Sequence, residues 1–156
     1  MNEALPQEIR GVLITVTGGR LLLPNASVSE VITMSNPEPV ENAPAWLLGR
    51  VSWRGWHVPL VSFPGMVGWE QTEGELHSRV AIIKALGGNP RMPFIAMLTQ
   101  GFPRLTALSP DVVVPDASEE ALPEGISAQV MVRDDQAYIP DLALIEARVS
   151  EVLAAA

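Results

Sequence analysis

The chain has 156 residues, of which 47% are hydrophobic and 18% are charged, and its formal net charge is −8. This length and hydrophobic content suit one compact domain, or two small subdomains that share one core. The acidic balance argues against partners that present phosphates, namely nucleic acid and an anionic membrane surface. Proteins that bind such partners usually carry an excess of Lys and Arg over Asp and Glu.

Strand-forming segments alternate with turn residues in the first half of the chain. Gly18-Gly19 is expected to form a hairpin turn, because glycine readily adopts positive φ. Three prolines make 35–44 a loop. Arg54-Gly55 marks a second hairpin turn, and Pro64-Gly65 ends that hairpin. The strands predicted here are Gly11–Thr17, Arg20–Pro24, Val28–Met34 and the two arms around Arg54-Gly55 within 43–61.

A linker is expected over Met66–Leu76, followed by a second β-rich half. Residues 87–91 form a predicted turn, and Asp134-Asp135 marks a predicted hairpin turn. The acidic, Pro-rich segment 109–125 is expected to be a loop with at most a short helix. The strands predicted in this half are Arg79–Leu86, Pro93–Leu98, Pro103–Leu108, Ser127–Val132 and Gln136–Ile139.

The end of the chain is predicted to be helical. Asp141 can cap the helix by accepting backbone N–H bonds. Apolar residues follow at helical spacing and form one face that we expect to pack across the strands. These residues are Leu142, Ile145, Val149, Val152 and Leu153.

Side chains for catalysis or metal binding do not cluster in the sequence. His57 and His77 are the two histidines, and neither has a second ligand at metal-binding spacing. The acidic pairs Glu119-Glu120 and Asp134-Asp135 point in opposite directions on an extended chain and are expected to be solvated. The sequence also lacks a glycine-rich phosphate loop. We therefore expect no catalytic residue, cofactor, metal or small-molecule substrate.

Cysteine content and the N-terminal segment bear on where the protein works. The chain has no cysteine, so it has neither disulfides nor thiolate chemistry. Residues 1–8 lack the basic and apolar regions of a secretory signal, and no apolar run approaches the ~20 residues that span a bilayer. We expect a cytoplasmic protein without direct membrane binding.

The most informative segment is APAWLLGRVSWRGWHVPLV, residues 43–61. It is typical of a strand, a tight turn and a second strand. It also fills nearly every fixed position of an aPxxxxGxxxxRGxxxPxxxL pattern. Two further segments, Leu21–Ile32 and Tyr138–Ile145, accompany it. Together the three segments resemble the CheW family of chemosensory coupling proteins.

The resemblance implies a mainly β fold. It consists of two small five-stranded, SH3-like β-barrels that share a core, followed by a C-terminal helix. Within a single domain over 1–156, it implies subdomain 1 at about 9–66, subdomain 2 at about 78–140 and the helix at about 141–154.

The resemblance also implies partners. In the family, one surface binds the regulatory domain of a CheA-type histidine kinase, and another binds the cytoplasmic tip of a methyl-accepting chemoreceptor. This chain would then be a non-enzymatic adaptor that couples the two. Matched position by position, the resemblance implies protein-binding roles for Val28, Glu30, Gly49 and Arg54.

Two of these residues suggest a specific contact. Val28 and Glu30 are two positions apart in a predicted strand and are expected to share one face. We expect the Glu30 carboxylate to pair with the guanidinium of Arg54 and to orient it toward a receptor-facing groove. The alternative is that both are ordinary solvated surface residues, whose pairing contributes little.

The chain departs from the family pattern in two places. Ser52-Trp53-Arg54-Gly55 stands where the family has Asn-Leu-Arg-Gly, and Trp56 follows, so Trp53 and Trp56 indicate an altered or enlarged contact. The tryptophans could equally be core residues. Met97–Pro103 lacks the aspartate of the family's Val-Asp-x-Val segment. These departures are similar to the ChpC-type adaptors of type IV pilus chemosensory systems, which act in twitching motility.

Two other classes of function stay open at this point. One is a generic small β-barrel module that binds a protein or peptide without a kinase partner. The other is a small hydrolase or isomerase with an unrecognised site, which the scarcity of histidine and the lack of a metal set argue against.

Overall fold

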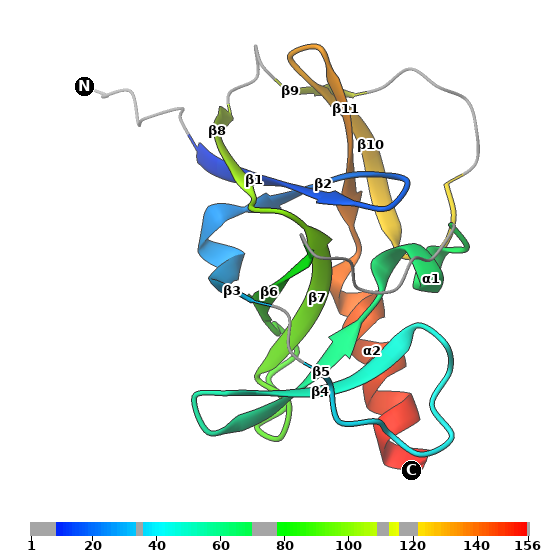
Figure 1. Ribbon diagram of the computed structural model, residues 1–156. Coiled ribbons are helices and arrows are strands. Elements are labelled where there is room, and N and C mark those ends of the chain that lie inside the picture. The colour runs from blue at the N-terminus through cyan, green and yellow to red at the C-terminus, as the bar shows by residue number, and fades with distance from the viewer. Residues whose placement is uncertain (1–8, 34–35, 70–77, 109–112, 116–121, 156) are drawn as a thin grey trace.

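The fold is seen in a computed structural model that describes residues 9–33, 36–69, 78–108, 113–115 and 122–155 (Figure 1). Its elements, in chain order, are β1 (Ile9–Val16), β2 (Gly19–Pro24), the 3₁₀ turn η1 (Asn25–Ser27), β3 (Val28–Thr33), β4 (Leu47–Trp53), β5 (Trp56–Val61), α1 (Phe63–Val67), β6 (Ser78–Lys84), β7 (Phe94–Gln100), β8 (Arg104–Leu108), β9 (Val113–Pro115), β10 (Ile126–Val132), β11 (Asp135–Pro140) and α2 (Leu142–Ala155). The prediction of a mainly β protein with a C-terminal helix is confirmed.

Two sheets build the molecule. One has six strands in the order β8-β1-β2-β11-β10-β9, and the other has five in the order β3-β6-β7-β5-β4. The sixth strand of the first sheet is β9, a three-residue strand inside the segment expected to be a loop over 109–125. Its residues pair with β10, and this pairing of distant segments has no signal in the local sequence.

Each sheet combines strands from both halves of the chain (Figure 1). A parallel pairing of β11 with β2 joins the end of the chain to its beginning, and another joins β5 to β7. The sheets therefore do not coincide with the ranges 9–66 and 78–140 expected for two subdomains. Parallel partners are distant in sequence, so local patterning does not reveal them.

Strands in the middle of each sheet are buried on both faces, and alternate residues enter two different cores. In β6, Ala81 and Ile83 face an interface core between the two sheets, whereas Val80 and Ile82 face a second core enclosed by the five-stranded sheet. The six-stranded sheet encloses a third core of its own, around Leu22. This alternation is the period of two expected for β-strands.

Helix α2 completes the interface core, as predicted. Its first turn is capped by Asp141, whose Oδ1 accepts the backbone N–H of Leu144 at 3.1 Å. Ile145 and Val149 are fully buried, and Leu142, Val152 and Leu153 pack beside them. Burial of each such side chain contributes about 1.5–3 kcal/mol, so this face fixes the helix across the strands.

Helix α1 corrects the expectation that Pro64-Gly65 simply ends the hairpin and that a linker begins at Met66. Ser62 caps the helix by accepting the Gly65 N–H at 3.2 Å, and a proline stands in the first turn. Phe63 and Met66 are buried in the interface core. Tertiary burial thus stabilises a helix too short to form alone.

The predicted turns are close to those observed. Arg54 and Gly55 both have positive φ, 49° and 82°, as the predicted hairpin turn requires. The turn predicted at Gly18-Gly19 lies one residue earlier, because Gly19 pairs with Val16. The turn predicted at Asp134-Asp135 also lies one residue earlier, because Asp135 pairs with β10.

Some expectations concern residues outside those that the structure describes. They are His77, the pair Glu119-Glu120, most of the expected linker (70–76) and parts of the acidic segment (109–112 and 116–121). Among the described residues, no helix has both the length and the apolarity to span a bilayer.

Candidate functional site

The Glu30 carboxylate joins two strands that are distant in sequence. Its Oε1 accepts hydrogen bonds from Trp53 Nε1 and Arg54 Nη2, each at 3.0 Å. The Arg54 guanidinium also lies over the Trp53 ring, 5.1 Å from its centroid. The predicted pairing of Glu30 with Arg54 is confirmed, and the indole N–H is a third member that the sequence analysis did not include.

These contacts close the five-stranded sheet into a barrel. Strands β3 and β4 are the two edges of that sheet, and Glu30 lies on β3 whereas Trp53 ends β4. Side chains from all five strands meet in the core between them. The hydrogen bonds to Glu30 therefore fasten one edge strand to the other, where no strand pairing occurs.

Three aromatic rings cluster beside this carboxylate. Phe94, at the start of β7, contacts Trp53 edge-to-face at a centroid distance of 4.8 Å and Trp56 at 6.2 Å. Trp53 is 9% exposed, so it is a core residue whose polar edge reaches Glu30. Trp56 is 41% exposed and offers a ring to a partner. Phe94 was missed because only the packing of β7 beside the hairpin reveals it.

Val28 does not share a face with Glu30, contrary to the sequence-based expectation. A β-bulge interrupts the pairing of β3 with β6 between these residues, so that Val28 pairs with Ile83 and Glu30 with the adjacent Ile82. The extra residue of a bulge reverses the alternation of side chains. Val28 consequently packs against the interface core, on the other side of the sheet from the carboxylate.

Gly49 has a backbone role in the structure. Its φ is 142°, and a Cβ at this position would lie 2.5 Å from the carbonyl oxygen of Glu38. Glu38 and Arg50 exchange two backbone hydrogen bonds of 2.8 Å, which hold the preceding loop against β4. Gly49 is buried and lets this loop approach closely.

The exposed part of the cluster is suited to binding a protein. The side chains of Arg54 and Glu30 are 70% and 39% exposed, and Trp56 lies beside the same turn. Arginine and tryptophan are the residue types most enriched at energetically important positions of protein interfaces. Over the described residues, His, Asp and Glu side chains form no group able to hold a metal.

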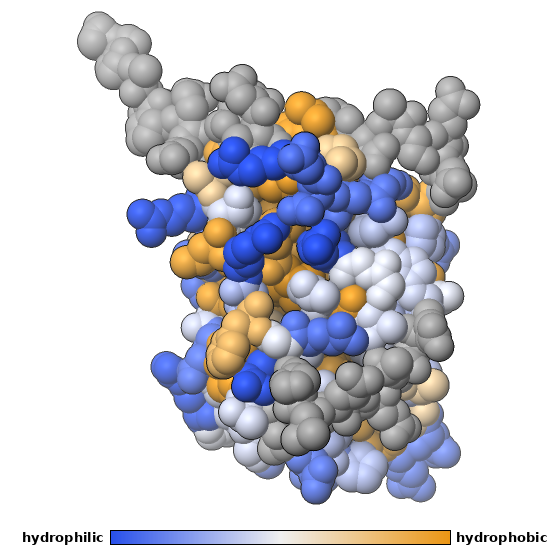
Figure 2. Space-filling model, turned by 45° about the horizontal axis from the view of Figure 1, so that its top comes forward, coloured by the Kyte–Doolittle hydropathy of each residue, from blue (hydrophilic) through white to orange (hydrophobic). Residues whose placement is uncertain are grey.

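A second polar cluster lies on the six-stranded sheet. Asp135 pairs with Arg104 at 2.9 Å and with Arg20 at 3.5 Å, so it is bridged by two cations rather than simply solvated as expected. Figure 2 shows hydrophilic side chains on the face that carries this sheet, around a strip of hydrophobic ones. All three side chains are well exposed, so each pair contributes less than about 1 kcal/mol.

Comparison with known proteins identifies the fold and the family. The model of the CheW-like domain family matches residues 10–148. The crystal structure of the scaffolding protein TtCheW from Thermoanaerobacter tengcongensis superposes with a TM-score of 0.73, at 15% sequence identity, over 91% of this chain and 90% of that chain. No curated protein sequence matches the chain. The structural likeness confirms the expected CheW-like, mainly β fold with its terminal helix.

Proposed function

The chain belongs to the CheW-like domain family, and on this basis we propose that it is a non-enzymatic adaptor that couples a chemoreceptor to a CheA-type histidine kinase. The family match over 10–148 is the observation that carries the proposal. Its partners would be the regulatory domain of the kinase and the cytoplasmic tip of a methyl-accepting receptor. The protein would act in the cytoplasm, close to the membrane through the receptor.

The cluster around Glu30 supports a division of roles among the candidate residues. Arg54 and Trp56 are exposed and would contact a partner directly. Glu30 and Trp53 would act by holding the guanidinium in place. A side chain that is already ordered loses less conformational entropy on binding, which favours affinity.

Val28 and Gly49 would contribute to partner binding without belonging to the exposed surface of Arg54 and Trp56. Val28 is only partly buried and would add an apolar contact on the opposite side of β3. Gly49 would keep the loop at Glu38 in position. Because Val28 lies on the other side of the sheet from Glu30, a second partner could use that side of the barrel.

A finer proposal concerns the signalling system. Trp56, which follows the family pattern's Arg-Gly, exposes an aromatic ring at the β4–β5 turn, and both it and Trp53, which replaces the family's leucine, pack against Phe94. We propose that the chain is a ChpC-type adaptor of a type IV pilus system, acting in twitching motility. Such an adaptor changes kinase activity only if it binds the active and inactive arrangements with different affinities.

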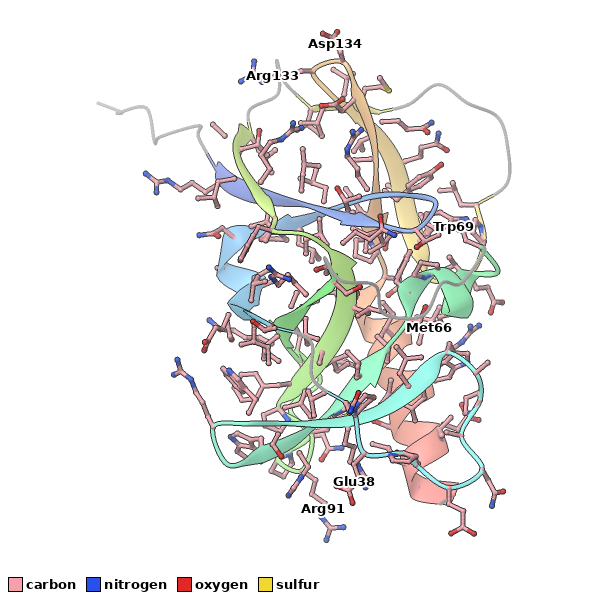
Figure 3. All side chains as sticks on the ribbon, viewed as in Figure 1. Glu38, Met66, Trp69, Arg91, Arg133 and Asp134 are labelled. Atoms are coloured by element: carbon pink, nitrogen blue, oxygen red, sulfur yellow. The ribbon has the colours of Figure 1, made fainter. Side chains whose placement is uncertain are left out.

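Isothermal titration calorimetry with the regulatory domain of a CheA-type kinase from the same genome tests the proposal. We expect saturable binding that Arg54→Ala and Trp56→Ala each weaken about tenfold or more. Arg133→Ala is the matched control, because this exposed arginine lies at the β10–β11 turn, at the opposite end of the molecule from Arg91 in Figure 3. It should leave the affinity unchanged.

Two results would count against the proposal. If the folded wild-type chain binds neither the kinase domain nor a receptor tip, a generic β-barrel binding module becomes the better description. If wild type binds but Arg54→Ala and Trp56→Ala have the affinity of Arg133→Ala, the adaptor role stands and the assigned surface is wrong.

A further inference from the structure

A groove separates α2 from the loop 85–93 that joins β6 to β7. It consists of two adjoining hollows of about 350 and 370 Å³, which share Asn89, Met92 and Ser150 in their walls. The remaining lining is largely apolar. Leu86, on the rim, is 73% exposed and adds apolar surface to the mouth of the groove.

The loop that forms one wall is held in place by several hydrogen bonds. The Leu86 N–H donates to Oε1 of Glu146, a carboxylate only 8% exposed on α2. The Ala85 N–H donates to the Pro93 carbonyl at 2.9 Å. The groove is therefore ordered before any partner arrives, which lowers the entropic cost of binding.

The other wall is a face of α2 with small side chains. Ala143, Ala147, Ser150 and Ala154 lie on one side of the helix, at spacings of four, three and four residues, and all border the groove. They extend over about 16 Å of helix at ~1.5 Å per residue. Small side chains let a second helix approach within roughly 8–10 Å, so the wall accommodates a helix of about three turns.

Positive charge is concentrated at one end of this groove. Arg50 and Arg91 both line the second hollow, and within the part of the chain that the structure describes neither guanidinium forms an ion pair. Glu38 lies at the same end (Figure 3), but it is joined to Arg50 through the backbone. In a chain with 18 acidic and 10 basic residues, two arginines that line the same hollow form a local site for acidic side chains of a partner.

We propose that this groove docks an amphipathic helix of a partner protein. The apolar face of that helix lies on Leu86, Met92 and the alanines of α2, and its acidic side chains face Arg50 and Arg91. A second copy of the chain fits less well, because two molecules of charge −8 repel each other. The groove uses different elements from the Glu30 cluster, so this inference does not rest on the proposed adaptor function.

Fluorescence anisotropy with a synthetic probe tests the proposal. The probe is a fluorescein-labelled amphipathic helix of about four turns, with leucines on one face and glutamates beside them, and its companion has lysines in place of the glutamates. We expect saturable binding of the acidic probe, weakened by salt, and at least about tenfold weaker binding of the basic companion.

Variants locate the probe on the protein. Ala147→Trp fills the groove from an exposed position of α2. A double variant with Arg50→Glu and Arg91→Glu reverses the charge at one end of the groove. Each variant should bind the acidic probe about tenfold or more weakly than the wild type. Arg133→Glu, a charge reversal at the β10–β11 turn, is the control and should have no effect. Circular dichroism and thermal unfolding confirm that each variant is folded.

Three results would overturn the proposal. The first is equal affinity for the acidic and basic probes, and the second is acidic-probe binding that Ala147→Trp leaves unchanged in a folded protein. The third is a concentration-dependent dimer, seen by light scattering, that Ala147→Trp abolishes, because the groove would then belong to a second copy. Kinase binding that survives Ala147→Trp shows that the two surfaces are separate.

Discussion

Replacing Glu30 with alanine removes the oxygen that accepts hydrogen bonds from both Trp53 and Arg54. The two losses differ in size because the donors differ in burial. The Trp53 side chain is 9% exposed, and a buried donor left without an acceptor costs about 1–3 kcal/mol. The ion pair with Arg54 is well exposed and contributes at most about 1 kcal/mol.

We therefore expect Glu30→Ala to lower the free energy of unfolding by about 1–3 kcal/mol, whereas Arg54→Ala lowers it by less than about 1 kcal/mol. Glu30→Gln keeps a side-chain oxygen for the indole N–H and should lie between the two. Urea unfolding followed by circular dichroism measures all three, since the signal does not depend on the tryptophans themselves.

Trp53→Phe separates the hydrogen bond from the ion pair. This change removes the donor, so Glu30→Ala in that background should cost less than in the wild type by about 1 kcal/mol or more. A second double-mutant cycle, with Glu30→Ala and Arg54→Ala, measures the coupling of Glu30 with Arg54, which should be smaller than the coupling of Glu30 with Trp53. If Glu30→Ala costs no more than Arg54→Ala, or if its cost is independent of Trp53, then the indole hydrogen bond does not fasten the two edge strands.

Two further predictions concern the backbone. Gly49→Ala should lower the free energy of unfolding by more than about 1 kcal/mol, because its positive φ is strained for alanine and a Cβ would collide with the Glu38 carbonyl. Gly88→Ala is the control: Gly88 also has positive φ but lies in open space, so this substitution should cost less. Asp141→Ala should cost about 0.5–2 kcal/mol in thermal or urea unfolding, because the Leu144 N–H loses its cap, whereas Asp141→Asn should restore most of that stability.

Local features of the fold were readable from the sequence. Strand-forming segments bounded by turn residues located most of the strands, and Arg54-Gly55 located the turn between β4 and β5. Asp141 and the apolar spacing after it predicted α2 and its buried face. These signals depend on residues a few positions apart, so they do not require knowledge of strand partners.

Pairings between distant segments depended on the tertiary structure. The order of the strands in each sheet mixes both halves of the chain. No local sequence pattern indicates that β9 pairs with β10, that β2 pairs with β11, or that β5 pairs with β7. The short helix α1 forms because the interface core covers its apolar residues.

The candidate site combined both kinds of information. The family pattern singled out Glu30 and Arg54, the chemistry of carboxylate and guanidinium predicted their pairing, and the structure confirmed it. The bulge that turns Val28 to the other face, the indole bond from Trp53 and the contact of Phe94 with both tryptophans were decided by register and packing. A shift of one residue in a strand exchanges its two faces, and the bulge that causes the shift in β3 appears only in its pairing with β6.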